Sequence, residues 1–590
     1  MQTLQKFFAG DKELIIPSYQ RDYAWEPRNI EDLFNDIQEA IETKTTHYIG
    51  TFILSSGDAE SELKIVDGQQ RLTTLYTLLS ALIARIKDEK RRSAYTYTFL
   101  VNSDGSNKLR LSGANSKFFI DLLASRQPEA LVKSQKRLAL AFNIITKQIS
   151  SLNQADLIQW VEAIKSFNVI EFIEIDEGKA IRMFQSVNDR GVPLSNMDKA
   201  KSLLIYYSNR FLNGSLDARI NDRFGECYTS FNLLKEEAGE EGYKINLIDR
   251  DVFTEDDIFK YHYLTYKHNI EKLDVAFDFR ANMDSVLNKY LKPALKQLRD
   301  DQNLLTKFII NYVQDLAGFF GAFSNIVGLL HKKNRLYHFL VIQNASANVY
   351  PLMIRLHQRN LLFSRGFNFL KKLYVVDMRV YKIRGTDPQK DIFTLAHESF
   401  DLNPAEIANR LLYFVRNFMS DSAFLSMLKN YEIYGNVGLP SILTELELNE
   451  IKASAEYNKS DDKATIIFDA LRGMLRKHQS VEHILPQTPN FDVGTYGFNG
   501  EDDYEEHINM IGNMTLLTES ENKSFNNTST DNKICDQAYY KKSFYRSTSQ
   551  LAYDLCGSGR RFTKAVLNAR TDEIAQFCVE KWPLWDEIGS

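Results

Sequence analysis

The hydrophobic positions near the start of the chain follow two different periods. Short apolar runs bounded by turn residues occupy residues 14–17, 48–54 and 63–66, and this pattern predicts three strands. Apolar residues recur every three or four positions through residues 29–43 and 69–86, which predicts two helices that each bury one face. The alternation of strands and helices predicts a small α/β region in this part of the chain.

The following segments carry a more helical pattern with one further strand. Residues 118–149 are expected to be helical, and the alternating residues 169–175 are expected to form a strand. A helix is expected at 179–187. Ser195 is expected to cap the next helix, with Asp198 three residues on, close to a capping box.

Helical spacing dominates the aromatic-rich stretch from 206 to 424, most clearly at residues 304–330 and 337–358. The nearest thing to a linker is residues 436–440, ahead of a helix expected at 441–451. The last part of the chain, with its Asn, Gly and Tyr clusters, indicates a compact α+β unit.

Together these patterns predict an α+β fold that is predominantly helical. We expect three domains, at residues 1–205, 206–435 and 436–590, of which the middle one is helical. A length of 590 residues agrees with three or four domains of about 150 residues each.

The composition is that of an ordinary soluble protein, with 44% apolar and 25% charged residues. No run approaches the ~20 apolar residues of a membrane helix, and residues 1–10 lack a signal peptide's pattern, so we expect a cytoplasmic protein without membrane contact. A net charge of −5 argues against a protein that coats nucleic acid, but little against an enzyme that meets DNA in one local groove. We expect reduced thiols, and neither a zinc cluster nor disulfides, from the widely spaced Cys227, Cys535, Cys556 and Cys578.

The most informative motif lies near the C-terminus, in the segment from Ser480 to Gln487 that contains Glu482-His483. Asn513 follows His483 by 30 positions, and Asn522 follows nine positions later. A lone histidine is more often structural than catalytic. The order Glu-His-x-x-Pro-Gln, Gly-Asn-x-Thr-Leu-Leu and Asn is much more specific, and it resembles an HNH nuclease motif.

Such a motif supplies the parts of metal-assisted phosphodiester hydrolysis. His483 is the expected general base that takes a proton from water. Asn513 is its expected orienting or loop-fixing partner. Asn522 and Glu482 are expected ligands of a hard divalent cation, Mg²⁺ or Mn²⁺, and His507 is expected near a phosphate.

A second set of polar motifs lies in the first 205 residues. The turn Asp67-Gly68-Gln69-Gln70-Arg71 stands between a strand and a helix start, where backbone N–H groups suit an anion and Arg71 adds forked donors. Gln20 and Arg21 are expected to face it, and Asn188, Arg190 and Gly191 form a third polar turn. Nucleotide phosphates or the DNA backbone are the ligands that these residues indicate.

An equally weighted alternative makes Arg21, Arg71 and Asp67 a buried ion-pair network that only holds the fold. The chain contains no G-x-x-x-x-G-K-[ST] motif, so a nucleotide site here is not a P-loop. The neighbouring aromatic residues are more simply explained as packing groups than as platforms for bases: Tyr19, Tyr23 and Trp25.

These motifs resemble those of the GmrSD type IV restriction enzymes. The N-terminal pair is similar to the ParB/sulfiredoxin-like domain of that family, and the segment Glu482 to Pro486 is similar to its HNH (ββα-metal) nuclease domain. Both are fused in one chain here, as in the single-chain members of the BrxU and SspE type. Met514 stands where the family usually has leucine, a swap that conserves volume.

The resemblance implies a restriction endonuclease that cleaves double-stranded phage DNA carrying modified bases or backbones. It also implies that the N-terminal domain binds and hydrolyses a nucleoside triphosphate (ATP, GTP or CTP) and helps to sense the modification. By motif, the implied nucleotide-site residues are Gln20, Arg21, Asp67, Gly68, Gln69, Gln70, Arg71, Asn188 and Arg190.

Two other functions agree with parts of the sequence. One is an NTP-dependent DNA-binding regulatory protein whose HNH fold is catalytically inactive. The other is a toxin-like nuclease that acts on RNA, which leaves the large N-terminal and middle regions without a task. Because one HNH site cuts one strand at a time, a double-strand break requires a homodimer or two successive visits.

Overall fold

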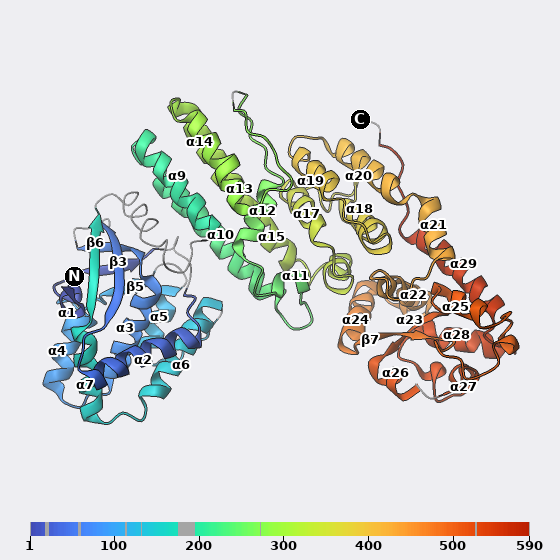
Figure 1. Ribbon diagram of the computed structural model, residues 1–590, viewed down its shortest axis with the longest axis horizontal. Coiled ribbons are helices and arrows are strands. Elements are labelled where there is room, and N and C mark those ends of the chain that lie inside the picture. The colour runs from blue at the N-terminus through green and yellow to red at the C-terminus, as the bar shows by residue number, and fades with distance from the viewer. Residues whose placement is uncertain are drawn as a thin grey trace. The chain divides into compact units, whose positions relative to one another are not determined.

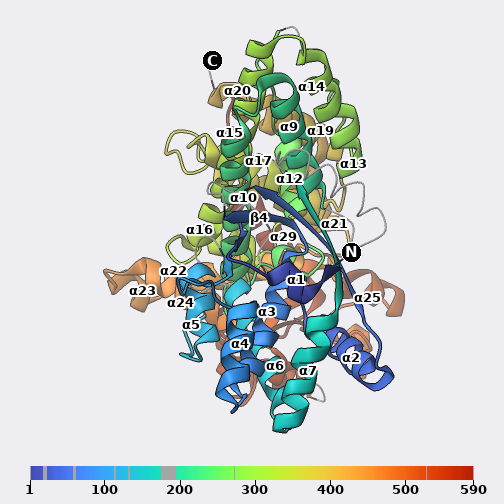
Figure 2. The same ribbon diagram turned by 90° about the vertical axis from the view of Figure 1, so that its left-hand side faces the viewer.

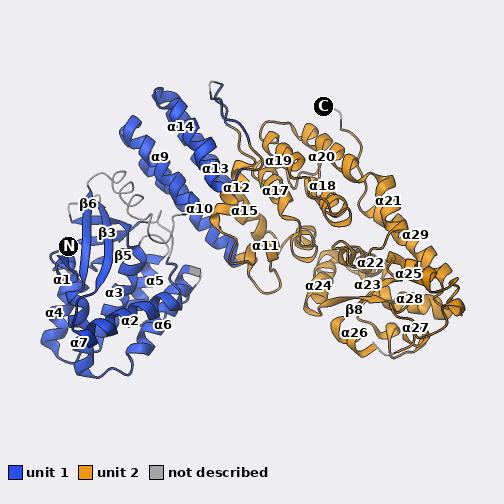
Figure 3. Ribbon diagram, viewed as in Figure 1, with its two compact units in different colours: residues 1–236, 268–277, 281–321 blue, residues 237–267, 278–280, 322–590 orange. Residues whose placement is uncertain are grey.

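The computed structural model describes residues 2–17, 23–56, 61–111, 115–130, 133–174, 195–271, 273–525 and 528–588. Figure 1 labels the helices and strands. Two compact units are distinguished in Figure 3: Met1–Glu236 with His268–Phe277 and Ala281–Gly321, and Glu237–Lys267 with Asp278–Arg280 and Ala322–Ser590. The predominantly helical α+β fold expected from the sequence is confirmed. The division into domains at residues 205 and 435 stays a prediction.

The first unit contains a mixed sheet of six strands in the order β1-β6-β3-β4-β2-β5. Its central strand β3 runs parallel to β6, with Phe52 opposite Glu171, and antiparallel to β4, with Leu54 opposite Ile65. The strand bounds are Gln2–Thr3 (β1), Glu13–Ile16 (β2), Tyr48–Ser56 (β3), Glu62–Asp67 (β4), Leu109–Leu111 (β5) and Asn168–Glu174 (β6). The four longer strands confirm the predictions, whereas β1 and β5 are too short to give a periodic signal.

Helices pack against this sheet around α3, which lies among α4, α6 and α7 (Figure 2). The helix bounds in this unit are Leu4–Phe8 (α1), Pro27–Thr43 (α2), Gln69–Ala84 (α3), Glu89–Phe99 (α4), Asn115–Leu123 (α5), Lys133–Ile149 (α6), Gln154–Ser166 (α7), Asn196–Leu212 (α9), Met283–Ser285 (α13), Val286–Leu291 (η2) and Lys292–Leu298 (α14). Two further helices, Asp217–Ala238 (α10) and Gln302–Gly328 (α15), contribute residues to both units.

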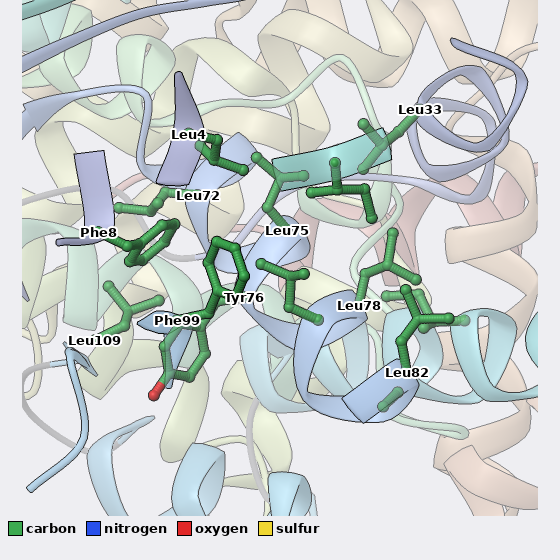
Figure 4. Close-up of a cluster of buried hydrophobic side chains, with 14 of the residues drawn as sticks. Leu4, Phe8, Leu33, Leu72, Leu75, Tyr76, Leu78, Leu82, Phe99 and Leu109 are labelled. Atoms are coloured by element: carbon green, nitrogen blue, oxygen red, sulfur yellow. The ribbon is translucent and has the colours of Figure 1, made fainter. Parts of the chain in front are cut away.

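The core of the first unit is built from α3. Leu72, Leu75, Leu78 and Leu82 are completely buried, and Leu4 from α1 packs into the same cluster (Figure 4). Burying a leucine side chain stabilises a fold by roughly 1.5–3 kcal/mol, so this helix anchors the sheet. Because α3 begins directly after Gly68, the core also fixes the position of the Asp67–Arg71 turn.

Two long helices expected from periodicity are interrupted in the structure. Residues 118–149 form α5 and α6, and between them Ser125 and Gln127 have positive φ angles of 57° and 49°. Residues 337–358 are broken at Asn344, which has a φ of 54°. Left-handed residues end a helix, and apolar spacing does not reveal them. The helix expected at 179–187 lies outside the described residues, whereas Ser195 caps α9 by accepting from the Asp198 N–H as expected.

The described residues of the second unit form helices and one two-stranded sheet. Its middle helices are Asn246–Asp249 (α11), Glu255–Tyr263 (α12), Asn334–Tyr337 (α16), His338–Ile342 (η3, a π-helix), Ala347–Val349 (η4), Tyr350–Gln358 (α17), Phe369–Val376 (α18), Asp377–Ile383 (η5, a π-helix), Gln389–Glu398 (α19), Pro404–Met419 (α20) and Asp421–Asn430 (α21). The later ones are Leu439–Ala453 (α22), Ala455–Lys459 (α23), Lys463–Arg476 (α24), Val493–Tyr496 (η6), Glu501–Ile508 (α25), Ile511–Asn513 (η7), Glu519–Phe525 (α26), Thr530–Cys535 (α27), Tyr540–Lys542 (η8), Arg546–Gly557 (α28) and Lys564–Lys581 (α29).

The two strands of this unit are β7 (Gln479–His483) and β8 (Met514–Thr518). They pair antiparallel, with Glu482 opposite Thr515 and His483 opposite Met514. Helix α26 follows β8 directly and packs against both strands. The assignment of this region to the HNH (ββα-metal) fold stays a prediction.

The expectation of four reduced cysteines is wrong for two of them. Cys535 and Cys556 form a disulfide, whereas Cys227 and Cys578 are free and buried. The packing of α27 on α28 brings the two Cα atoms to 5.7 Å, within the range of a disulfide. A separation of 21 residues carries no motif, which is why the sequence gives no sign of the pair.

Among the described residues, every helix is too short or too polar to cross a membrane.

The structure predicts that Gly68→Ala destabilises the first unit. Gly68 has a φ of 91°, and an added Cβ would lie 2.3 Å from Cδ1 of Phe52 in β3. We expect a loss of about 1–3 kcal/mol in the free energy of unfolding, measured by urea denaturation. The matched control is Gly321→Ala, within α15, where the new Cβ would have no described neighbour within 4 Å beyond the backbone of its own helix. It should be neutral or slightly stabilising, and equal losses for the two variants would contradict the prediction.

Candidate functional site

His483 lies at the end of β7, and its ring is held by an asparagine that the motif did not indicate. The Nε2 atom of His483 lies 3.2 Å from Oδ1 of Asn509, at the end of α25. An amide oxygen only accepts hydrogen bonds, so Nε2 carries the proton and the lone pair is on Nδ1. His483 is 9% exposed. The ring is therefore fixed in one tautomer, with Nδ1 as its basic atom.

A segment before α22 supports both members of this pair. The backbone N–H groups of Ile433 and Tyr434 donate to the carbonyl oxygen of Asn509 at 3.0 and 3.2 Å. The Tyr434 ring lies 4.3 Å from the His483 ring, centroid to centroid. Tyr434 thus covers one side of the imidazole and restricts its rotation.

Burial lowers the pKa of His483 below its ordinary value of 6.5. The bond to Asn509 and the negative charge of Glu482 oppose this shift, while the Lys533 ammonium adds to it. The imidazole is therefore neutral near pH 7, which is the form that can accept a proton.

Asn513 fixes the backbone around this histidine rather than contacting its ring. Its side chain is completely buried. Its amide oxygen accepts from the Leu485 N–H at 2.9 Å, and its amide nitrogen donates to the carbonyls of Leu485 at 3.0 Å and Ile508 at 2.8 Å. The Ile484 N–H also donates to the Asn513 carbonyl at 2.9 Å. Of the two roles expected for Asn513, the geometry supports loop fixing, and Asn509 takes the orienting position.

Asn522 lies on α26 and faces β7. Its Nδ2 donates to Oγ of Ser480 at 2.8 Å, three residues before His483. Because alternate residues of a strand share a face, Ser480 and Glu482 point to the same side of β7 as Asn522. The nitrogen is occupied by Ser480, which leaves the amide oxygen of Asn522 as the atom that can meet a ligand.

Glu482 belongs to a buried ion pair that the sequence did not indicate. Its Oε1 lies 2.6 Å from Nζ of Lys533 on α27 and accepts from the Tyr540 hydroxyl at 3.3 Å. Glu482 and Lys533 are 8% and 7% exposed. The Lys533 ammonium thus occupies one carboxylate oxygen of Glu482. At most the other oxygen, Oε2, is available to the metal expected there.

His507 lies two residues before Asn509, within a small group of possible metal ligands. The ligand atoms of Asp503, Glu506 and His507 lie within 4.8 Å of one another. The Asp503 carboxylate is already paired with Nζ of Lys564 at 2.6 and 2.8 Å, and His507 Nδ1 bonds to the Asp503 carbonyl at 2.7 Å. This group is accounted for as a structural ion pair. The contact of His507 with phosphate stays a prediction.

The N-terminal motif forms a tight turn at the start of α3. The Asp67 carboxylate accepts from the Gly68 N–H at 2.7 Å, and Gln70 accepts from the Ala24 N–H at 2.8 Å. Gln69 is 8% exposed, and its Oε1 has no hydrogen-bond partner among the described residues. A buried amide oxygen without a partner suits a ligand that donates a hydrogen bond.

Arg71 is directed at the central strand of the sheet. Its guanidinium donates to the carbonyls of Ile49 at 2.9 Å and Thr51 at 3.5 Å. It packs so closely over Gly50 that a Cβ there would lie 1.5 Å from Nη1. Gln20, Arg21, Asn188 and Arg190 lie outside the described residues, with Gly191, so their place beside Arg71 stays a prediction.

Comparison with known families finds matches to two parts of the chain. The sequence model of the GmrSD restriction endonuclease N-terminal domain matches residues 4–205, and that of the GmrSD restriction endonuclease C-terminal domain matches residues 418–577. A comparison with curated proteins finds no match. The fold and the two matches define a nuclease of the restriction type, an enzyme that acts on DNA. The chain belongs to the GmrSD restriction endonuclease family.

We expect Lys533→Met to destabilise the second unit strongly, because it leaves the Glu482 carboxylate buried without a counter-charge. The loss should be about 3–5 kcal/mol in the free energy of unfolding, measured by urea denaturation. Replacing both partners, as in Glu482→Gln with Lys533→Met, should recover part of the lost free energy of unfolding.

The matched control is Lys523→Met, which breaks the exposed pair between Lys523 and Glu519 on α26. Its effect should stay within about 0.5 kcal/mol. If Lys533→Met were as mild as this control, the Glu482–Lys533 pair would not hold the site.

Proposed function

We propose that this protein is a modification-dependent type IV restriction endonuclease that cleaves double-stranded phage DNA through an HNH site. The observation that carries the proposal is the neutral, oriented imidazole of His483 at the end of β7, held by Asn509 and followed by the β8–α26 unit. The match of residues 418–577 to a nuclease domain supports it.

In the proposed reaction His483 Nδ1 takes a proton from the water that attacks the scissile phosphorus. Asn509 keeps the Nε2–H in place, so the imidazolium that forms is stabilised by the bond it already makes. Asn513 holds the Leu485 backbone, and with it the end of β7, while the charge on the ring changes. Such a base contributes typically 10²–10⁴-fold to a rate.

The residues on the Asn522 face fit a hard divalent cation, Mg²⁺ or Mn²⁺. Their free donors are oxygens, the Asn522 Oδ1 and the second carboxylate oxygen of Glu482, and hard cations prefer few protein oxygens with several waters. When bound, the cation would neutralise charge on the phosphate. Lys533 beside Glu482 limits that carboxylate to a single contact with it.

We further propose that the Asp67–Arg71 turn binds a nucleoside triphosphate (ATP, GTP or CTP) and that this binding gates cleavage. Gly68 allows close approach of the backbone, and the unpartnered Gln69 Oε1 can accept from a nucleotide group. Arg71 contributes by holding β3 to α3 through Ile49, which keeps the turn in shape. We also propose that the protein hydrolyses the nucleotide and senses a modification of the DNA. A homodimer would cut both strands.

The direct test is His483→Ala on a panel of differently modified phage DNAs, with Mg²⁺ and with each nucleotide in turn. Wild type should cleave at least one modified DNA and spare unmodified DNA. The variant should lose about 10²–10⁴-fold in rate, because it lacks the proposed general base.

The matched control is His331→Ala, an exposed histidine paired with Glu240, which should cleave at the normal rate. Binding of DNA by wild type without any nicking would favour a regulatory protein with an inactive HNH fold. Degradation of RNA alone would favour an RNA-directed toxin.

The pH dependence gives an independent test of the base. Because the pKa of His483 is lowered, its base form predominates near pH 7, and the rate should fall only as the pH drops below 6.5. In Asn509→Leu the ring loses the hydrogen-bond acceptor that favours its protonated form. The pH below which the rate falls, the falling limb of the pH–rate profile, should therefore move lower, and the plateau rate should drop. A limb above pH 7 in wild type, or an unmoved limb in Asn509→Leu, would argue against His483 as the base.

A further inference from the structure

The second unit contains a cavity that the proposed reaction does not use. Its volume is about 380 Å³, and it is lined by residues from α16, η3, α18, α22, α24 and the end of α29. This volume is within the range of pockets that hold small molecules. The cavity is separate from the Asp67–Arg71 turn, which lies in the first unit.

Four cationic side chains converge on this cavity: Arg335, Lys371, Lys452 and Lys581. Of these four, Lys581 has a carboxylate partner in the described part of the chain, with its Nζ 2.5 Å from Oε2 of Glu445. Among the described residues Arg335, Lys371 and Lys452 form no ion pair. Burial and the charges of Lys581 and Arg335 lower the pKa of Lys452, while the Glu445 carboxylate opposes this shift. Such an unpaired cluster at a partly enclosed site favours an anionic ligand.

The deepest polar groups of the cavity are Glu445 and His338. Glu445 is 3% exposed, and its Oε1 accepts from the Tyr374 hydroxyl at 2.7 Å and lies 3.3 Å from Nδ1 of His338. Lys581 balances the charge of Glu445, and the exposed Glu580 is the second carboxylate of the lining, so four cations less two carboxylates leave an excess of two positive charges.

His338 supplies a second, independent sign of a ligand. The side chain is 5% exposed, yet its Nε2 has no hydrogen-bond partner among the described residues. Burial lowers the pKa of His338, so the ring is neutral. With the Nδ1 proton directed to Glu445, Nε2 is left as an acceptor for a hydroxyl or amine donor. His338 also begins the π-helix η3, an element that is often found at functional sites.

We propose that this cavity binds a small phosphorylated molecule that also carries a hydroxyl group. The phosphate would lie on Arg335, Lys371 and Lys452, and the hydroxyl would donate to Nε2 of His338. Its size favours a compound such as a sugar phosphate or mononucleotide over the backbone of a DNA duplex, which is too wide to enter. Helix α22, which lines the cavity, also contacts β7, since Thr444 donates to Gln479 at 3.3 Å.

The experiment titrates the full chain with inorganic phosphate, ribose 5-phosphate, AMP and a short DNA duplex. Calorimetry would measure affinity, and hydrogen exchange would locate binding. Ribose 5-phosphate and AMP should slow exchange at residues 334–343 and 445–452, and should bind more tightly than inorganic phosphate. Added salt should weaken the binding, since the contacts are ionic.

The decisive variant is the double substitution Lys371→Ala with Lys452→Ala. Both lysines are unpaired, so the melting temperature without ligand should be unchanged or higher. Affinity should fall at least about tenfold, as expected when charged hydrogen bonds are lost. The matched control is Lys390→Ala, an exposed lysine on α19 outside the cavity, which should bind as wild type does.

Several results would overturn the proposal. No heat and no protection at millimolar sugar phosphate would show that the cavity is not a ligand site, and unchanged affinity in the double variant would place the ligand elsewhere. Protection by the duplex alone would make this a DNA contact. A lower melting temperature of the double variant without ligand would show that the cations are structural.

Discussion

The side-chain amide of Asn513 is bonded at both ends to backbone groups, and the C-terminal site depends on these bonds. It joins the backbone of Leu485, just after β7, to the carbonyl of Ile508, just before Asn509. The distance between the histidine and its orienting asparagine is therefore set by a third, buried residue. Losing this amide would leave several buried backbone groups without partners, at a cost of about 1–3 kcal/mol each.

Helix α29 supports the same arrangement from behind. Arg570 donates to the carbonyls of Gly512 and Met514, on either side of Asn513, and Thr571 accepts from the Gly512 N–H. At its far end the helix carries Lys581, which lines the cationic cavity. One helix thus contacts both the backbone of the nuclease site and the proposed ligand site, and gives a physical connection between them.

Much of the fold could be predicted from local sequence, because the apolar residues follow a strand or helix pattern in β2, β3, β4, β6, α2 and α3. The failures have local causes as well. Left-handed residues such as Asn344 interrupt the helices while the apolar spacing continues through them. The disulfide between Cys535 and Cys556 depends on the packing of two helices, which no spacing encodes.

The motif residues of the candidate site could be named from the sequence, whereas the residues that surround them could not. His483, Asn513 and Asn522 stand in a recognisable order within about 40 residues of sequence. Tyr434, Asn509 and Lys533 come from three other segments and meet the motif only through the fold. Asn509 did have one visible signal, an amide four residues before Asn513, but nothing in the sequence distinguishes it from other surface asparagines.

The contact between Gly50 and Arg71 limits how the N-terminal motif can change during evolution. The guanidinium occupies the space where any other residue at position 50 would carry its Cβ, and the Gly50 φ of 116° disfavours such residues as well. A lineage that keeps the arginine must keep the glycine. A lineage that loses the arginine still has a restraint at position 50, because the positive φ angle of the backbone there continues to favour glycine. In related sequences the two positions should therefore vary together, with the glycine lost only where the arginine has gone first.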